Sequence, residues 1–92
     1  MFTWLNKQGV RSSEGFEVQF TGRFSAEYRE GTKVITLDVE DSFWGGADSI
    51  SIRDDAFERW DHSTAHNSPQ EQLRLRTNFR EALKFQGLGL HP

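Results

Sequence analysis

The stretch that decides the fold is FEVQFTGRFSAEYREGTKVITLDVE, residues 16–40. Apolar and polar side chains alternate in it, and this period of two is typical of strands that have one face in water. Short turns interrupt the alternation, and they favour antiparallel pairing because parallel strands need long crossovers. The alternating runs occupy residues 16–20, 24–29 and 33–40.

A fourth run of the same kind, residues 49–53, follows a Gly-rich turn at residues 42–48. The four runs together predict a four-stranded antiparallel meander over residues 16–53, with one apolar face. That face would consist of Phe16, Val18, Phe20, Phe24, Ala26, Tyr28, Ile35, Leu37, Val39, Ile50 and Ile52.

The sequence Ser68-Pro69-Gln70-Glu71 predicts the start of a helix. Ser68 and Glu71 have the spacing of a capping box, and proline suits the first helical position because its missing amide hydrogen costs nothing there. The helix should reach about Gln86 and stop at Gly87, a residue suited to the left-handed backbone beyond a helix end. One face of it is apolar, formed by Leu75, Phe79, Ala82 and Leu83.

These elements predict one α+β domain over residues 1–92, in which a single amphipathic C-terminal helix covers a four-stranded sheet (ββββα). Phe2, Trp4 and Leu5 would either dock on the core or form a short edge strand. The tail would pair with the sheet edge or fray. By segment, the prediction is a weakly patterned stretch at residues 1–15 with a polar turn at 9–15, sheet at 16–53, loop at 54–67, helix at 68–86 and tail at 87–92.

Composition excludes several classes of function. The chain has no cysteine, which excludes disulfides, thiolate zinc sites and a cysteine nucleophile. No apolar run approaches the length of a membrane span, and the N-terminus lacks a signal-peptide pattern, so we expect a cytoplasmic protein. Net charge is −3, and residues 1–69 are the acidic part, with 7 Lys and Arg against 12 Asp and Glu. An acidic body disfavours general binding of nucleic acid.

Motifs for catalysis and for metal binding are missing. The chain contains no GxSxG, no HExxH and no phosphate-binding glycine loop. His62 and His66 are four residues apart and follow Asp61, but the serine, threonine and asparagine around them indicate a polar loop rather than a metal site. We therefore expect no enzyme activity, no cofactor and no metal.

The predicted partner-binding residues are three acidic side chains and two tryptophans. Glu27, Asp38 and Glu40 alternate onto the exposed face of the predicted sheet, where they form either a solvated face or a patch for a basic protein. Trp44 lies in the Gly-rich turn and Trp60 in a polar run. Tryptophan is common at binding hot spots, but both could instead cap the open ends of the core.

Three basic residues form a ridge along the predicted helix at spacing i, i+4, i+8. Arg76, Arg80 and Lys84 could contact the phosphates of single-stranded nucleic acid, or they could form a solvated helix face balanced by Glu81.

Several scattered segments resemble the immunity protein 74 family. They are Tyr28-Arg29-Glu30-Gly31, a strand ending in Val39-Glu40, Arg59-Trp60-Asp61, and the stretch NFREALKFQG at residues 78–87. The resemblance covers about residues 15–90. It implies a small bacterial protein that neutralises a cognate toxin, with Glu40 and Trp60 at the matching positions.

The predicted order of elements also resembles single-stranded DNA-binding transcriptional coactivators and Whirly-type domains. Those proteins bind through basic, aromatic sheet faces, whereas the sheet face predicted here carries Glu17, Glu27, Asp38 and Glu40. The sequence therefore favours a non-enzymatic protein-binding module whose partner is a protein, such as a basic toxin. Nucleic-acid binding is the alternative. A monomer and a homodimer both remain open, because an open sheet has two free edges.

Overall fold

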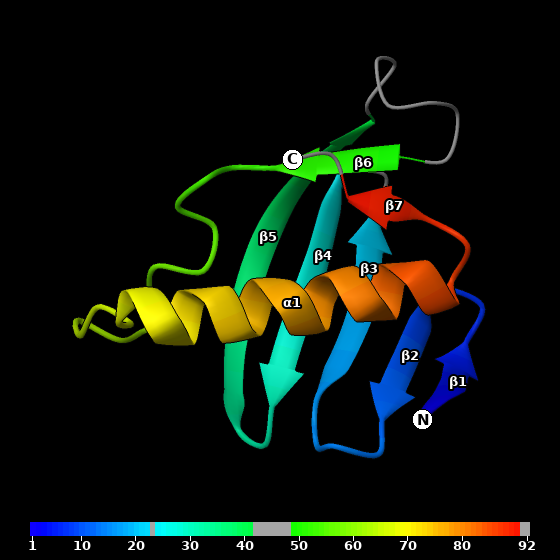
Figure 1. Cartoon of the computed structure of the whole chain (residues 1–92), viewed down its shortest axis with the longest axis horizontal. Helices are drawn as coiled ribbons and strands as arrows, with labels where there is room; N and C mark the ends of the chain where they lie inside the picture. Colours follow the sequence, from blue (N-terminus) through cyan, green and yellow to red (C-terminus); the bar gives the residue numbers. More distant parts are fainter. Residues whose placement is uncertain (23, 42–48, 91–92) are drawn as a thin grey trace.

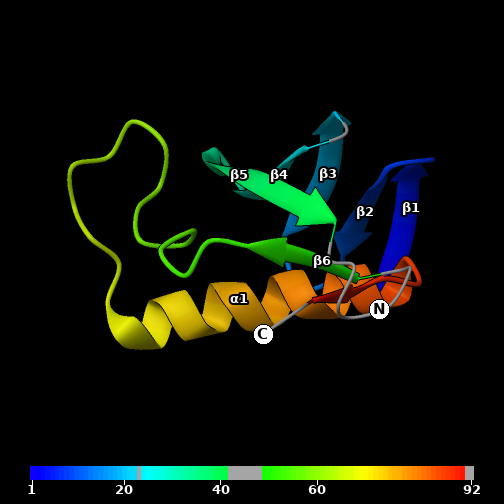
Figure 2. The same cartoon turned by 90° about the horizontal axis from the view of Figure 1, so that it is seen from above.

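The computed structural model describes residues 1–22, 24–41 and 49–90 (Figure 1). A sheet curls as a half-barrel around one side of a single helix, which crosses its concave face (Figure 2). The sheet order follows the chain order, β1 to β7. The described elements are β1 (Phe2–Asn6), β2 (Gly9–Ser12), β3 (Glu17–Gly22), β4 (Ser25–Glu30), β5 (Lys33–Asp41), β6 (Ser49–Ile52), α1 (Pro69–Phe85) and β7 (Gly89–Leu90).

The predicted four-stranded sheet is wrong, because the described residues form seven strands in one sheet. The α+β content and the antiparallel pairing of the predicted strands are confirmed. Two of the additional strands precede residue 16 and one follows the helix. The core therefore extends beyond the predicted meander in both directions of the sheet.

Strand β2 occupies most of the segment predicted as a turn, residues 9–15. Its sequence, Gly-Val-Arg-Ser, has one apolar side chain, so no alternation is visible. Pairing with β3 makes it a strand: Val10 lies opposite Val18, and the Ser12 amide donates to the Phe16 carbonyl at 2.8 Å. The missing side chain of Gly9 makes room for the Gln19 amide, which binds Asn6 of β1.

The C-terminal tail pairs with the sheet instead of fraying. Gly87 ends the helix in the left-handed region, at φ 83°, and the Leu88 amide donates to the Leu83 carbonyl at 2.8 Å. This arrangement satisfies the last carbonyls of the helix and turns the chain back. Gly89 and Leu90 then lie parallel to Ser49 and Ile50 of β6.

The helix begins and ends close to the predicted residues. Ser68 Oγ accepts from the Glu71 amide at 3.1 Å, as the capping box predicts, while the Glu71 carboxylate binds Arg74 instead of reaching back. The predicted apolar face is confirmed, and its four side chains are fully buried. They pack against the inward side chains of the sheet. The prediction for Phe24 is wrong: it was assigned to the apolar sheet face, but it precedes β4 and is 56% exposed.

Aromatic side chains link the sheet, the helix and the segment before the helix. Tyr28 stacks on Phe16 at 5.6 Å between ring centroids and meets Phe57 edge-on at 5.7 Å. Phe57 in turn contacts Phe79 of α1 at 5.8 Å. Residues 53–67 contain no strand, yet they place Phe57 and Trp60 in the core, 1% and 8% exposed. This segment closes the end of the core that β5 leaves open.

A polar network ties the end of β4 to the first turns of α1. Tyr28 donates its hydroxyl hydrogen to Glu30 and accepts from Asn78 at 2.9 Å. Arg74 donates two hydrogen bonds to Glu30, at 2.9 and 3.0 Å, and two to Glu71. Burial disfavours the charge of Glu30, but the bonds from Arg74 and Tyr28 outweigh burial and lower the pKa of Glu30 below its usual value.

The lowered pKa of Glu30 predicts a stability that depends on pH. Glu30 contributes stability that is fully present above its unfolded pKa of about 4.3 and is lost as pH falls through its folded pKa. We expect Glu30→Gln to lower the free energy of unfolding by about 2 kcal/mol at pH 7 and to flatten its decline below pH ~4. Urea denaturation between pH 3 and 7 measures both effects. Glu81→Gln, at an exposed helix position, is the control and should change neither the free energy of unfolding nor its pH dependence. An equal change in both variants would contradict the role given to Glu30.

Candidate functional site

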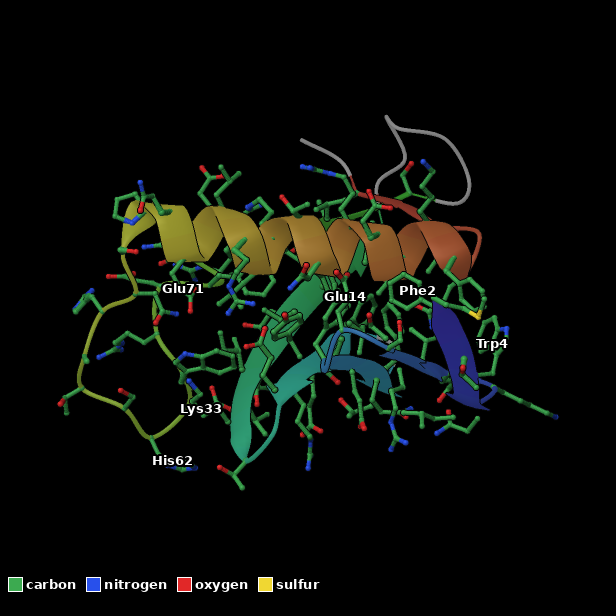
Figure 3. All side chains as sticks on the ribbon, turned by 60° about the horizontal axis from the view of Figure 1, so that its bottom comes forward. Phe2, Trp4, Glu14, Lys33, His62 and Glu71 are labelled. Carbon is green, nitrogen blue, oxygen red and sulfur yellow. The ribbon has the colours of Figure 1, made fainter. Side chains whose placement is uncertain are left out.

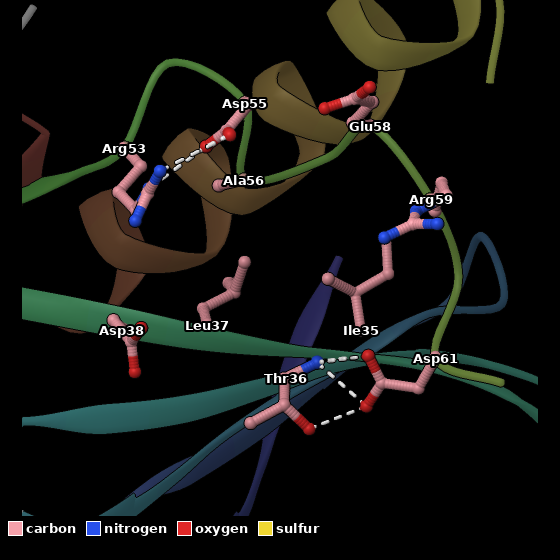
Figure 4. Close-up of a pocket in the computed structure, with 10 residues that line it drawn as sticks. All are labelled: Ile35, Thr36, Leu37, Asp38, Arg53, Asp55, Ala56, Glu58, Arg59 and Asp61. Carbon is pink, nitrogen blue, oxygen red and sulfur yellow. Dashed lines mark hydrogen bonds and ion pairs between the residues drawn. The ribbon is translucent and has the colours of Figure 1, made fainter. Parts of the chain in front are cut away.

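A polar groove lies beside the edge of β5 (Figure 4). Strand β6 pairs with β5 only over Val39–Asp41, so the earlier part of that edge faces the segment that follows β6. The groove between them has a volume of about 270 Å³. Its lining residues are Ile35, Thr36, Leu37, Asp38, Arg53, Asp55, Ala56, Glu58, Arg59 and Asp61.

Asp61 fixes one end of the groove. Its amide donates to the Val34 carbonyl at 2.8 Å, and its carboxylate accepts from the Thr36 amide at 3.1 and 3.2 Å. The Thr36 hydroxyl donates to the same carboxylate at 2.6 Å. Asp61 therefore satisfies the β5 edge where no strand pairs with it, and the next residue, His62, turns the chain away with φ 65°.

Carboxylates outnumber guanidinium groups around the groove. Four acidic residues, Asp38, Asp55, Glu58 and Asp61, line it together with Arg53 and Arg59. Arg53 pairs with Asp55 at 3.0 Å, and Glu58 with His66 at 2.7 Å. Among the described residues, Asp38 has no hydrogen-bond or ion-pair partner for its carboxylate. The groove thus offers a negative field with at least one carboxylate available to a ligand.

The structure brings the three predicted acidic residues together on the outer face of the sheet. Asp38 and Glu40 are exposed on β5, and Glu27 is half-buried on β4, where it pairs with Arg29 at 3.4 Å. Glu27 lies opposite Thr36 and so close to Asp38. The predicted face therefore continues into the groove at Asp38.

The two predicted tryptophans contribute differently. Trp44 lies outside the described residues. Trp60 lies in the core, which was the alternative prediction to a role as a binding hot spot. It is 8% exposed, and its ring centroid lies 6.1 Å from that of Tyr28. The Lys33 ammonium covers the ring at 5.0 Å, a cation–π contact. Trp60 is therefore part of the core and offers little surface to a partner.

The basic ridge predicted for nucleic acid is split. Arg76 donates to the carbonyls of Arg53 and Asp54, at 3.1 and 3.2 Å, and its guanidinium lies 5.9 Å from the Phe57 ring centroid. Arg80 and Lys84 are exposed. Arg76 thus anchors the segment before the helix, and two cations of the ridge face the solvent.

The described residues contain no cluster of three metal-ligating side chains, and His66 is engaged with Glu58. The sequence did not predict Arg53, Asp55 and Glu58 as site residues, and Asp61 was considered only together with His62 and His66. The carboxylates at 54 and 55 are visible in the sequence, but only the fold places residues 53–61 against β5. The sequence offers one local signal: Asp61 directly follows Trp60, and a tryptophan that lies in the core brings the next residue close to the core.

No protein-family model, curated protein or solved structure matches the chain. In the described part of the chain, no helix is long and apolar enough to cross a membrane. The resemblance to the immunity protein 74 family stays a prediction that rests on the residues quoted for it.

The bonds of Asp61 predict a measurable role in stability. Asp61→Ala should lower the free energy of unfolding by about 1.5 kcal/mol, because the Thr36 amide and hydroxyl both lose a charged acceptor. Amide hydrogen exchange at Thr36 should become faster. Asp55→Ala, which removes a carboxylate bonded to exposed Arg53, is the control and should cost less than about 0.5 kcal/mol. Equal losses in the two variants would refute this role of Asp61.

Proposed function

We propose that this chain is a non-enzymatic protein-binding module that receives a basic segment of a partner protein in the groove beside β5. The observation that carries the proposal is the charge of the residues that line the groove: four carboxylates, Asp38, Asp55, Glu58 and Asp61, against two guanidinium groups. A lysine or arginine side chain that enters the groove would meet the exposed carboxylate of Asp38.

The outer face of the sheet supports the same partner chemistry. Glu27, Asp38 and Glu40 extend the negative field from the groove across β4 and β5. Such a field accelerates the encounter with a basic protein, and salt screens it. A basic bacterial toxin, the partner implied by the resemblance to the immunity protein 74 family, fits this chemistry. The chain has no cysteine, which suits a reducing compartment, so the proposal places the encounter in the cytoplasm.

Binding of a defined basic peptide tests the proposal. We expect a fluorescent peptide of alternating arginine and glycine to bind the wild-type chain, with an affinity that falls between 50 and 200 mM salt. The double variant Asp38→Asn/Asp55→Asn should bind about tenfold more weakly, because it removes two carboxylates and leaves Arg53 unpaired and repulsive. Fluorescence anisotropy measures the affinity.

A matched control separates the groove from net charge. Glu14→Gln/Glu81→Gln changes the net charge by the same amount at exposed positions outside the groove lining, and it should bind the peptide like the wild type. Equal weakening in the two double variants would contradict a site in the groove. Tight, salt-sensitive binding of oligothymidine by the wild type, lost in Arg80→Gln/Lys84→Gln, would instead favour the nucleic-acid alternative.

A further inference from the structure

Strand β1 is one end of the sheet, and one of its two edges is free in the described structure. The Ser13 amide donates to the Met1 carbonyl at 2.9 Å, so the backbone groups of Met1 point toward β2. In an antiparallel ladder the direction alternates from residue to residue, so the backbone groups of Thr3 also point toward β2. The N–H and C=O groups of Phe2 and Trp4 therefore point away from β2. Four backbone groups are available to another strand.

The free edge has none of the charges that usually prevent edge-to-edge pairing. Residues 2–6 read Phe-Thr-Trp-Leu-Asn and contain no charged residue and no proline. An irregularity in the register between Trp4 and Asn6 ends the regular part of the strand. The pairing surface is therefore confined to Phe2, Thr3 and Trp4, where it is regular and uncharged.

Exposed aromatic rings lie beside this edge, next to the C-terminal end of α1 (Figure 3). Trp4 is 49% exposed and Phe85 is 41% exposed, and their ring centroids are 5.5 Å apart. Phe2 stacks on Phe85 at 5.4 Å. Phe2 and Trp4 are thus on the helix-covered face of the sheet, while Thr3 between them faces outward opposite Arg11.

We infer that β1 pairs antiparallel with β1 of a second copy of this chain, about a two-fold axis at Thr3. In this register Phe2 lies opposite Trp4 of the partner subunit, and four backbone hydrogen bonds form between these residues. The paired aromatic side chains meet on the same face and cover the rings that a monomer exposes. The two sheets become one continuous sheet, and the contact is closed by its symmetry.

The β1 edge is complementary to itself, and this property points to a second copy of the chain as its partner. The two residues with free backbone groups are placed symmetrically about Thr3, so one strand offers the other the donors and acceptors that it needs. Residues 2–6 have no charged side chain, so two copies of β1 meet without like-charge repulsion between these side chains, whereas a charged peptide would find no complementary side chain in β1. The groove beside β5 lies four strands away in the sheet order and stays open.

The solution mass tests this inference. We expect light scattering to give the wild-type chain twice its mass of 10.6 kDa, and Trp4→Lys, which places a charge at the two-fold contact, to give the monomer mass. Leu73→Lys also replaces an exposed apolar side chain by lysine, on the solvent face of α1, and should remain dimeric. Far-UV circular dichroism identifies any variant that fails to fold. A wild-type mass of 10.6 kDa at about 100 μM would overturn the inference.

Cross-linking tests the register. The chain has no cysteine, so Thr3→Cys introduces a single thiol that would lie opposite its own copy. Residues directly opposite in a non-hydrogen-bonded pair have Cα atoms about 4.5 Å apart, within the range of a disulfide. Mild oxidation should link Thr3→Cys into a covalent dimer, while Thr77→Cys, exposed on α1, should stay largely unlinked. Equal linking of the two variants would exclude this pairing even if the chain dimerises.

Discussion

The structure depends on the burial of one helix face against a curled sheet. Leu75, Phe79, Ala82 and Leu83 are fully buried, and α1 is the one helix in the described chain that supplies such a face. A flat sheet would leave its outer strands without contact to a single helix. Curling brings strands from both ends of the sheet onto α1: β2 and β7 both contact it. The half-barrel shape thus follows from covering a wide sheet with one helix.

The same constraint determines where functional surfaces can form. The helix covers the concave face, which leaves the convex face, the strand edges and the segment before the helix for partners. Residues 53–61 have to return from β6 to the start of α1, and they cross the open end of the core, where Phe57 and Trp60 fill the interior. The charged residues between these two aromatics necessarily remain outside. The groove beside β5 is the outer side of this closure.

The sequence predicts the elements that carry a strong local pattern. The alternation from Phe16 to Glu40 and the capped, amphipathic helix are visible because side-chain period and capping chemistry are local properties. Strand β2 and β7 have too few apolar residues to show a period, and their strand conformation depends on neighbours already in place. The acidic sheet face was predictable for the same local reason. The groove was not, because the pairing of Asp61 with Thr36 joins residues 25 positions apart.

The acidic groove and the β1 edge differ in the physics of recognition. The groove offers charge, which attracts from a distance and weakens with salt, while the edge offers backbone hydrogen bonds and aromatic area, which act only in contact. Because the groove beside β5 lies four strands from β1 in the sheet order, a two-fold pairing through β1 would leave the grooves of both copies free. A dimer of this geometry could hold two basic segments of one partner, and the second binding event would then be intramolecular.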